Sequence, residues 1–217
     1  VDQWAGEAWL NQIEQIADQV KKSCDAFVLI GVGGSNNAAR SVIEALAGNG
    51  VEIIYAGNTL SPHALQKMLR SLEGRDYAID CIAKNFETLE PGSSFRILRE
   101  AMAKKYSREE AAKRTICTGT YGSSLEKLCQ MEGYTFVPFP TDVGGRYSAF
   151  SFVGLLPMAV AGIDIRSLVQ GGRDMERLLH ETDARSNPAL RYAVLRNLYH
   201  RQGYALEMLA SFEPQLR

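Results

Sequence analysis

Short apolar runs alternate with longer amphipathic stretches over the first 140 residues, and this alternation constrains the fold more than any other sequence feature. The run at residues 26–30 (AFVLI) contains no polar side chain. Uninterrupted runs of this length suit parallel strands that are covered on both faces. Together with four further short runs that are mainly apolar, this run predicts strands at residues 26–30, 51–56, 77–83, 114–118 and 134–137.

Segments with helical periodicity separate these runs. In residues 2–22, apolar side chains recur at the spacing of one helix face. Ser61 and Pro62 supply an N-cap and a first-turn proline for a later segment. This pattern implies a three-layer α/β/α domain, with a five-stranded parallel sheet of flavodoxin-like type and right-handed crossovers. Its helices are expected at residues 2–22, 36–47, 61–72, 90–105 and 123–131.

The alternation of short apolar runs with amphipathic stretches ends after Pro140. Residues 148–161 are apolar almost throughout, and Pro157 is expected to kink or divide any helix there. We therefore divide the chain into an α/β domain at residues 1–140 and an appended helical region at residues 141–217.

Two further amphipathic helices are expected in the appended region, at residues 164–180 and 188–201. Tyr192 and Tyr199 fall on one face of the second helix and are interpreted as core residues. The segment at residues 204–209 (YALEML) has the pattern of a strand.

The charge balance excludes several classes of function. The 217 residues include 24 Lys+Arg and 25 Asp+Glu, which gives a formal net charge of -1. A nearly neutral chain is a poor candidate for nonspecific binding to nucleic acid or to anionic membranes. No segment reaches the ~18 consecutive apolar residues of a membrane span, and the polar N-terminus is unlike a secretory signal. We expect a cytoplasmic protein without nucleic-acid or membrane partners.

Cysteine and histidine spacing indicates neither a disulfide framework nor a metal site. The cysteines form no C-x-x-C pair and are expected to be reduced, as in a cytosolic protein. The histidines have no ligand-like spacing, so no structural metal is expected. These residues are Cys24, Cys81, Cys117, Cys129, His63, His180 and His200.

The strongest local signal is the glycine-rich segment at residues 31–35 (GVGGS), between a predicted strand and a predicted helix. Glycines there let backbone N–H groups approach a ligand, and the helix N-terminus favours an anion. Asn36 stands where a dinucleotide fingerprint needs glycine or alanine, and no Lys-Ser/Thr of a P-loop follows. The segment is therefore either an anion-binding loop or a tight turn without a ligand.

A second candidate loop, at residues 83–91 (AKNFETLEP), follows the third predicted strand. Lys84, Asn85 and Thr88 could donate hydrogen bonds to phosphate oxygens. Alternatively, Thr88 is a plain N-cap and Lys84 a solvated charge.

The third candidate is the segment at residues 142–148 (DVGGRYS). Its two glycines precede Arg146, whose guanidinium could bind an oxyanion or a phosphate. Alternatively, the segment is a surface turn in which Arg146 pairs with Asp142.

These three segments, in this order, resemble the N-terminal half of the glucose-6-phosphate isomerase family, whose members contain two sugar-isomerase (SIS) domains. Residues 31–35 match the family's G-[IV]-G-G-S loop, and residues 142–148 match its D-V-G-G-R-[YF]-S signature in full. Residues 153–157 (VGLLP) fit as well, and residues 83–91 resemble the family's phosphate loop, S-K-S-G-T-T-T-E-P.

The resemblance implies interconversion of glucose 6-phosphate and fructose 6-phosphate through a cis-enediolate, without a cofactor. Arg146 would be catalytic, because an enediolate oxyanion needs a cation in a dry site. The family acts as a homodimer, which the resemblance implies for the full-length protein. The residues implied to bind the phosphorylated hexose are Gly34, Ser35, Lys84, Asn85, Thr88 and Gly145.

Two departures from the family qualify these expectations. In the phosphate loop Ala83, Asn85 and Glu87 replace hydroxyl residues, which removes donors and adds a carboxylate. The family's catalytic Glu, ring-opening His and C-terminal Lys come from the second SIS domain, and the chain runs from Val1 only to Arg217. We expect an N-terminal half that is inactive alone, or a non-catalytic SIS module that binds a sugar phosphate. A flavodoxin-like nucleotide-binding domain would leave Arg146 without a role.

Overall fold

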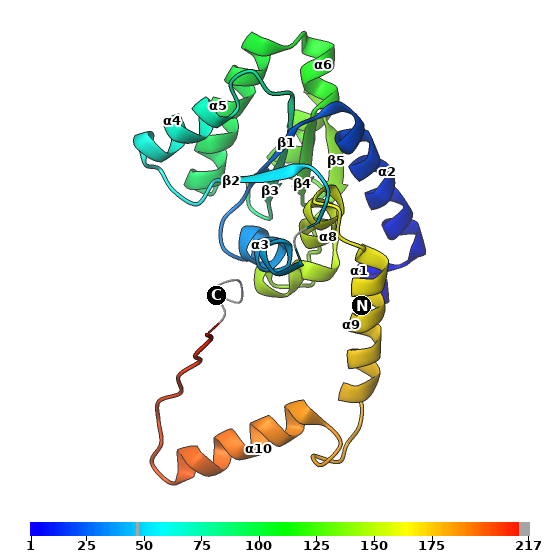
Figure 1. Cartoon of the computed structure of the whole chain (residues 1–217), viewed down its shortest axis with the longest axis vertical. Coiled ribbons are helices and arrows are strands. Elements are labelled where there is room, and N and C mark those ends of the chain that lie inside the picture. The colour runs from blue at the N-terminus through cyan, green and yellow to red at the C-terminus, as the bar shows by residue number, and fades with distance from the viewer. Residues whose placement is uncertain (47, 213–217) are drawn as a thin grey trace.

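A computed structural model describes residues 1–46 and 48–212 as a parallel sheet with helices on both faces (Figure 1). The strand order is β2-β1-β3-β4-β5, and every neighbouring pair is parallel. This confirms the predicted α/β class and all five strands to within a residue or two at their ends. The strands are β1 (Ala26–Ile30), β2 (Glu52–Ala56), β3 (Tyr77–Ala83), β4 (Thr115–Gly119) and β5 (Thr135–Pro138).

The helices follow the predicted order, with one break near the N-terminus and one short helix, Arg108–Lys113, that the sequence pattern did not predict. Gly6 has extended backbone and separates α1 from α2, where the periodicity predicted a single helix. Ser61 caps α4 by accepting a hydrogen bond from the Ala64 N–H. The helices are α1 (Asp2–Ala5), α2 (Glu7–Ser23), α3 (Gly34–Leu46), α4 (Pro62–Ser71), α5 (Leu89–Lys105), α6 (Arg108–Lys113), α7 (Ser124–Glu132), the 3-10 helix η1 (Gly145–Phe150), α8 (Phe152–Val160), α9 (Ile165–Leu179) and α10 (Pro188–Arg201).

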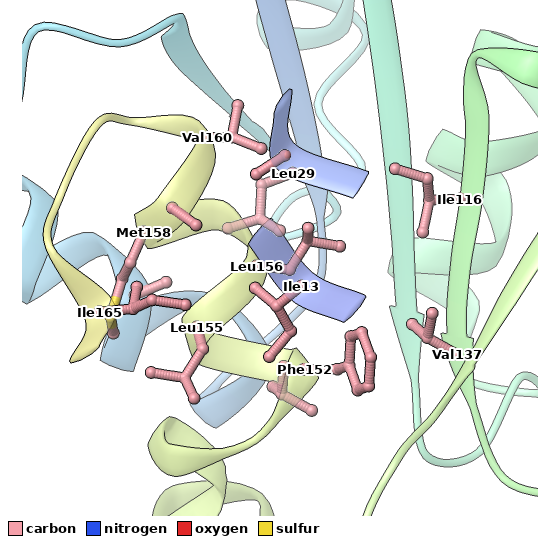
Figure 2. Packing of buried hydrophobic residues seen from close by; sticks show 14 of the residues in the cluster. Ile13, Leu29, Ile116, Val137, Phe152, Leu155, Leu156, Met158, Val160 and Ile165 are labelled. Atoms are coloured by element: carbon pink, nitrogen blue, oxygen red, sulfur yellow. The ribbon is translucent and has the colours of Figure 1, made fainter. Parts of the chain in front are cut away.

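Side chains of β1 alternate between two apolar cores, one on each face of the sheet. Phe27 and Leu29 face a core formed with α2, α3, α8 and α9, part of which Figure 2 shows. Val28 and Ile30 face a second core formed with α4, α5 and α7. Burying each such side chain contributes about 1.5–3 kcal/mol, so continuous apolar strands are stable only between two helical layers.

Helix α8 is buried on every side, which explains its uniformly apolar sequence. The apolar stretch is divided as expected, but the division lies at Ser151, between η1 and α8. Ser151 caps α8 by accepting a hydrogen bond from the Val153 N–H, at 3.3 Å. Pro157 lies inside the continuous helix, so its expected role as the breaking point is wrong. Although α8 follows residue 140, it packs into the same core as β1.

Helix α10 extends away from the sheet at the far end of α9 (Figure 1). None of its residues is buried, so the interpretation of Tyr192 and Tyr199 as core residues is wrong. Residues 204–209 are also exposed and are not a strand, because no strand lies beside them in the described part of the chain to supply hydrogen bonds. Sequence pattern alone could not reveal either outcome, since both depend on which segments lie beside these residues in the fold.

The corner between α9 and α10 is built on the buried Asn187. Its amide donates to the carbonyls of Leu179 and Glu181, at 3.0 and 2.7 Å. Its side-chain oxygen accepts from the N–H groups of Ala189 and Leu190 and so caps α10. One side chain thereby fixes the direction in which α10 leaves α9.

Polar groups inside the sheet are few. Asp80, at the centre of β3, is fully buried and accepts a hydrogen bond of 3.0 Å from the Thr118 hydroxyl. Burial raises the pKa of Asp80 from 3.8 to about 7. Cys81 and Cys117 are buried in neighbouring strands, and both are free thiols.

Candidate functional site

The three candidate loops meet at the carboxyl edge of the sheet. In the order β2-β1-β3-β4-β5, β1 and β3 are adjacent and the chain winds away from them in opposite directions. This is a topological switch point, where open α/β sheets bind ligands in the crevice beyond the strand ends. Residues 31–35 leave β1 there, residues 84–88 leave β3, and residues 141–148 follow β5.

The glycine loop touches residues 141–148, which we call the arginine loop. Gly33 adopts a left-handed conformation (φ 61°), and its carbonyl accepts from the Asn36 and Asn37 N–H groups as α3 begins. A Cβ atom on Gly34 would lie 2.1 Å from the Gly145 carbonyl oxygen and 2.7 Å from the Arg146 nitrogen. Only glycine at residue 34 therefore allows the two backbones to approach this closely. Ser35 lies beside this contact, half-buried in the first turn of α3.

The predicted phosphate loop is closed by its own hydrogen bonds. The side-chain oxygen of Asn85 accepts from the Glu87 N–H at 3.0 Å, and the Thr88 hydroxyl donates to the Asn85 carbonyl at 3.0 Å. Thr88 stands at the N-cap of α5, but its side chain makes no capping hydrogen bond. The amide nitrogen of Asn85 and the first turn of α5 remain as donors for an anion.

Lys84 reaches across to the arginine loop. Its ammonium donates to the carbonyls of Thr141 and Val143, at 3.2 and 2.9 Å. It also lies 5.7 Å from the centre of the Phe139 ring. Lys84 is therefore not a solvated charge without partners.

Arg146 is exposed at the start of η1. Among the described residues it forms no hydrogen bond or ion pair, so its guanidinium is free to meet an anion. The alternative pairing with Asp142 is not observed. Asp142 instead accepts from Gln3 Nε2 at 2.8 Å and from Trp4 Nε1 at 3.0 Å.

The sequence pattern did not predict the hydrogen bonds that Gln3 and Trp4 donate to Asp142. An indole N–H that is partly buried usually has an acceptor, and that rule pointed to a polar contact without identifying Asp142. Nothing in the sequence indicates Gln3.

Lys84, Asn85 and Arg146 are all exposed on the loops. The clefts along α9, of about 760 Å³, and along α10, of about 640 Å³, are lined by other residues. In the described part of the chain, no three His, Cys, Asp or Glu side chains are grouped so as to hold a metal ion. Among the same residues, no helix combines the length and apolar character needed to cross a bilayer.

Comparison with known proteins identifies the family. The model of the phosphoglucose isomerase family matches residues 12–217. A glucose-6-phosphate isomerase of Staphylococcus saprophyticus is 37% identical over 214 residues, covering 95% of this chain and 48% of that protein. One of Pediococcus pentosaceus is 38% identical over 219 residues, covering 95% and 49%. The chain thus spans about half the length of the curated relatives it matches.

Solved structures support the same fold. A hypothetical protein of Thermus thermophilus superposes with a TM-score of 0.82 at 25% identity, over 88% of this chain and 46% of that one. A glucose-6-phosphate isomerase of Chlamydia trachomatis gives a TM-score of 0.77 at 20% identity, over 91% and 38%. With the family model matched over nearly the whole length, the chain belongs to the phosphoglucose isomerase family.

Proposed function

We propose that this chain forms the N-terminal half of a glucose-6-phosphate isomerase, which interconverts glucose 6-phosphate and fructose 6-phosphate through a cis-enediolate. The observation that carries the proposal is the backbone contact between Gly34 and Gly145 at the switch point, because it joins the glycine loop and the arginine loop into one surface. Membership of the family supports the reaction class. We further propose that the whole protein is a cytoplasmic homodimer.

Arg146 is assigned the catalytic role in this half. Proton transfer between C1 and C2 places negative charge on an oxygen of the enediolate, and a positioned cation stabilises that charge. The Arg146 guanidinium forms no hydrogen bond or ion pair with the described residues, so none has to break when it meets an anion. The Arg146 backbone lies beside Gly34. A free guanidinium on a fixed backbone is suited to this task, since little reorganisation is needed during the reaction.

The phosphate of the sugar is assigned to the ends of β1 and β3. The first turn of α3 supplies Gly34 and Ser35, and the first turn of α5 follows Asn85 and Thr88. Two helix N-termini directed to one edge favour a dianion there. Gly145 lines the same surface. The resemblance adds Lys84 to this set, but its ammonium already has two carbonyl partners.

The isolated chain is proposed to bind substrate without converting it. The expected base belongs to the family's second domain, and proton transfer has no agent without it. The exposure of Arg146 and Asn85 supports this, because a site that buries a small ligand needs a second wall over such residues. Residues 141–217 would then lead from the α/β domain at residues 1–140 to that second half.

A chimaera tests the proposal. Residues 1–217 are fused to the second half of the Staphylococcus saprophyticus relative, and formation of glucose 6-phosphate from fructose 6-phosphate is followed in a coupled assay. We expect turnover by the chimaera, none by residues 1–217 alone, and full activity of the intact relative as the control. A folded chimaera without turnover would contradict the isomerase assignment.

A non-catalytic module that binds a sugar phosphate is the second candidate, and Glu87 favours it. Its exposed carboxylate lies in the loop that would receive a dianion. Calorimetric titration of the chain with fructose 6-phosphate, and with fructose as the control, separates the candidates when combined with the chimaera. Binding by the chain together with an inactive, folded chimaera would favour the module.

A further inference from the structure

We propose that Lys84, Gln3 and Trp4 are positioning residues that fix the arginine loop and thereby place Arg146. The inference deepens the proposed function and rests on it, since that function assigns Arg146 to the charge of the reaction. It gives Lys84 a role other than the phosphate contact that the resemblance implies, and it assigns a role to α1. The family model matches residues 12–217, so α1 lies outside the matched segment.

The first contact comes from the end of β3. An ammonium group has three donors, and Lys84 directs two of them to Thr141 and Val143. These carbonyls flank Asp142, so the lysine holds the loop immediately before its glycines. A charge-assisted hydrogen bond is stronger than a neutral one, and two of them restrain the chain in two places.

The second contact comes from α1. Asp142 accepts from Gln3 and Trp4, which precede it by 139 and 138 residues. The Trp4 ring stacks on Trp9 at 6.3 Å, and Trp9 meets the buried Phe152 edge-on at 5.6 Å. The aspartate is therefore tied through aromatic rings to the core beneath α8.

The third contact is the backbone approach of Gly34 to Gly145. Restraints from β1, β3 and α1 thus converge on residues 141–145, directly before Arg146. The same loop leaves the guanidinium without a described partner. The arrangement fixes the backbone and frees the charged group, as preorganised stabilisation of an anion requires.

Amide hydrogen exchange on the 217-residue chain tests the inference without any ligand. The reporter is the Tyr147 N–H, which donates to the Gly144 carbonyl at 2.9 Å within the loop. We expect at least about tenfold faster exchange at Tyr147 in Lys84→Met and in Trp4→Phe, with unchanged exchange in β1. Lys84→Arg, which keeps the charge and the donors, should restore most of the protection. Lys67→Met, at an exposed lysine of α4, is the matched control and should change nothing.

Two results would overturn the inference. One is unchanged Tyr147 exchange in both Lys84→Met and Trp4→Phe. The other is weakening of inorganic phosphate binding by tenfold or more in Lys84→Met while Tyr147 exchange stays constant, because Lys84 would then be a phosphate ligand. If Trp4→Phe does not fold, Asp142→Asn serves in its place, since it removes the charge of the same contact.

Failure of the proposed function gives a different pattern. A wild-type chain that binds neither fructose 6-phosphate nor inorganic phosphate, and an inactive chimaera, would remove the function but leave the exchange result intact. In an active chimaera, Lys84→Met should lower kcat by tenfold or more and change KM by less than threefold. If Lys84 only stabilised the fold, Lys84→Met would lower the amount of folded enzyme, and the kcat of each folded molecule would not fall.

Discussion

Replacing Gly34 with alanine adds one carbon atom at the contact between the glycine and arginine loops. That atom would lie 2.1 Å from the Gly145 oxygen and 2.3 Å from the Gly145 carbonyl carbon. Real Cβ atoms essentially never approach another heavy atom within 3.0 Å, so the loops must separate by about 1 Å. Both partners are backbone, and neither can turn aside as a flexible side chain would.

The expected cost is that of overpacking, about 1–3 kcal/mol of unfolding free energy. For a chain of this size, each kcal/mol corresponds to roughly 2–4 °C in melting temperature, so Gly34→Ala should lower Tm by about 2–12 °C. The displacement also moves Arg146, because the added carbon would lie 2.7 Å from its nitrogen. We therefore expect at least about tenfold weaker binding of fructose 6-phosphate, equivalent to about 1.4 kcal/mol.

Calorimetry measures both effects, as the melting temperature and as the dissociation constant. Gly145→Ala is the matched control, since a Cβ there meets no atom within 4 Å and its φ is not in the left-handed region. It should melt within about 4 °C of the wild type, because a substitution without strain changes stability by less than about 1 kcal/mol. Equal melting temperatures and equal affinities for Gly34→Ala and wild type would refute the reasoning.

Three other outcomes are expected. The folded chain keeps a proton on Asp80 up to about pH 7, while the unfolded chain loses it near pH 3.8, so the unfolding free energy should fall as pH rises through this window. Asp80→Asn should abolish this fall, which is on the order of 1–4 kcal/mol in total across the window and is measured by urea titrations at several pH values; an unchanged slope would show that other groups cause it. A disulfide reagent should modify only the half-buried Cys24 in the native chain and all four thiols after unfolding; rapid reaction of several native thiols would contradict the burial described. Arg146→Ala in an active chimaera should lower kcat by about 10²–10³ with little change in KM, whereas an effect on KM alone would assign Arg146 to binding of the ground state.

Features that depend on local pattern could be predicted from the sequence. The apolar run of β1 predicted a strand, because a strand buried on both faces cannot carry polar side chains without partners. The other four strands contain polar residues but were predicted from the same alternation with helical segments. The Ser61-Pro62 pair marked the start of α4 for an equally local reason, since the serine caps the first turn. The loops at the ends of β1 and β3 were placed together by topology, because parallel strands direct their carboxyl ends to one edge.

Features that depend on distant partners could not be predicted. The glycine and arginine motifs were each recognisable from the sequence. The sequence did not indicate that the backbone of Gly34 lies against the backbone of Gly145. The sequence suggested Arg146, four residues away, as the alternative partner of Asp142, whereas the donors that bind it are Gln3 and Trp4, 139 and 138 residues away. The helix expected at residues 188–201 is present as α10, but its apolar side chains are spread around the helix, so the expected amphipathic face is wrong. The sequence also did not indicate whether another segment covers α10. In each case the outcome depended on which distant segments lie close together in the fold, and the sequence does not show this.

Because none of its residues is buried, α10 is expected to unfold independently of the sheet. The helix has 14 residues and buries none of them, and an isolated helix of that length is only marginally stable in water. Its hydrogen bonds therefore depend on the Asn187 cap and on local propensity, so it opens by itself at a free energy near zero. β1, between two packed layers, opens only when the whole sheet unfolds. If another surface bound α10, the helix would unfold only after that surface had dissociated. The increase in the amide-exchange protection of α10 would then measure the free energy of that binding.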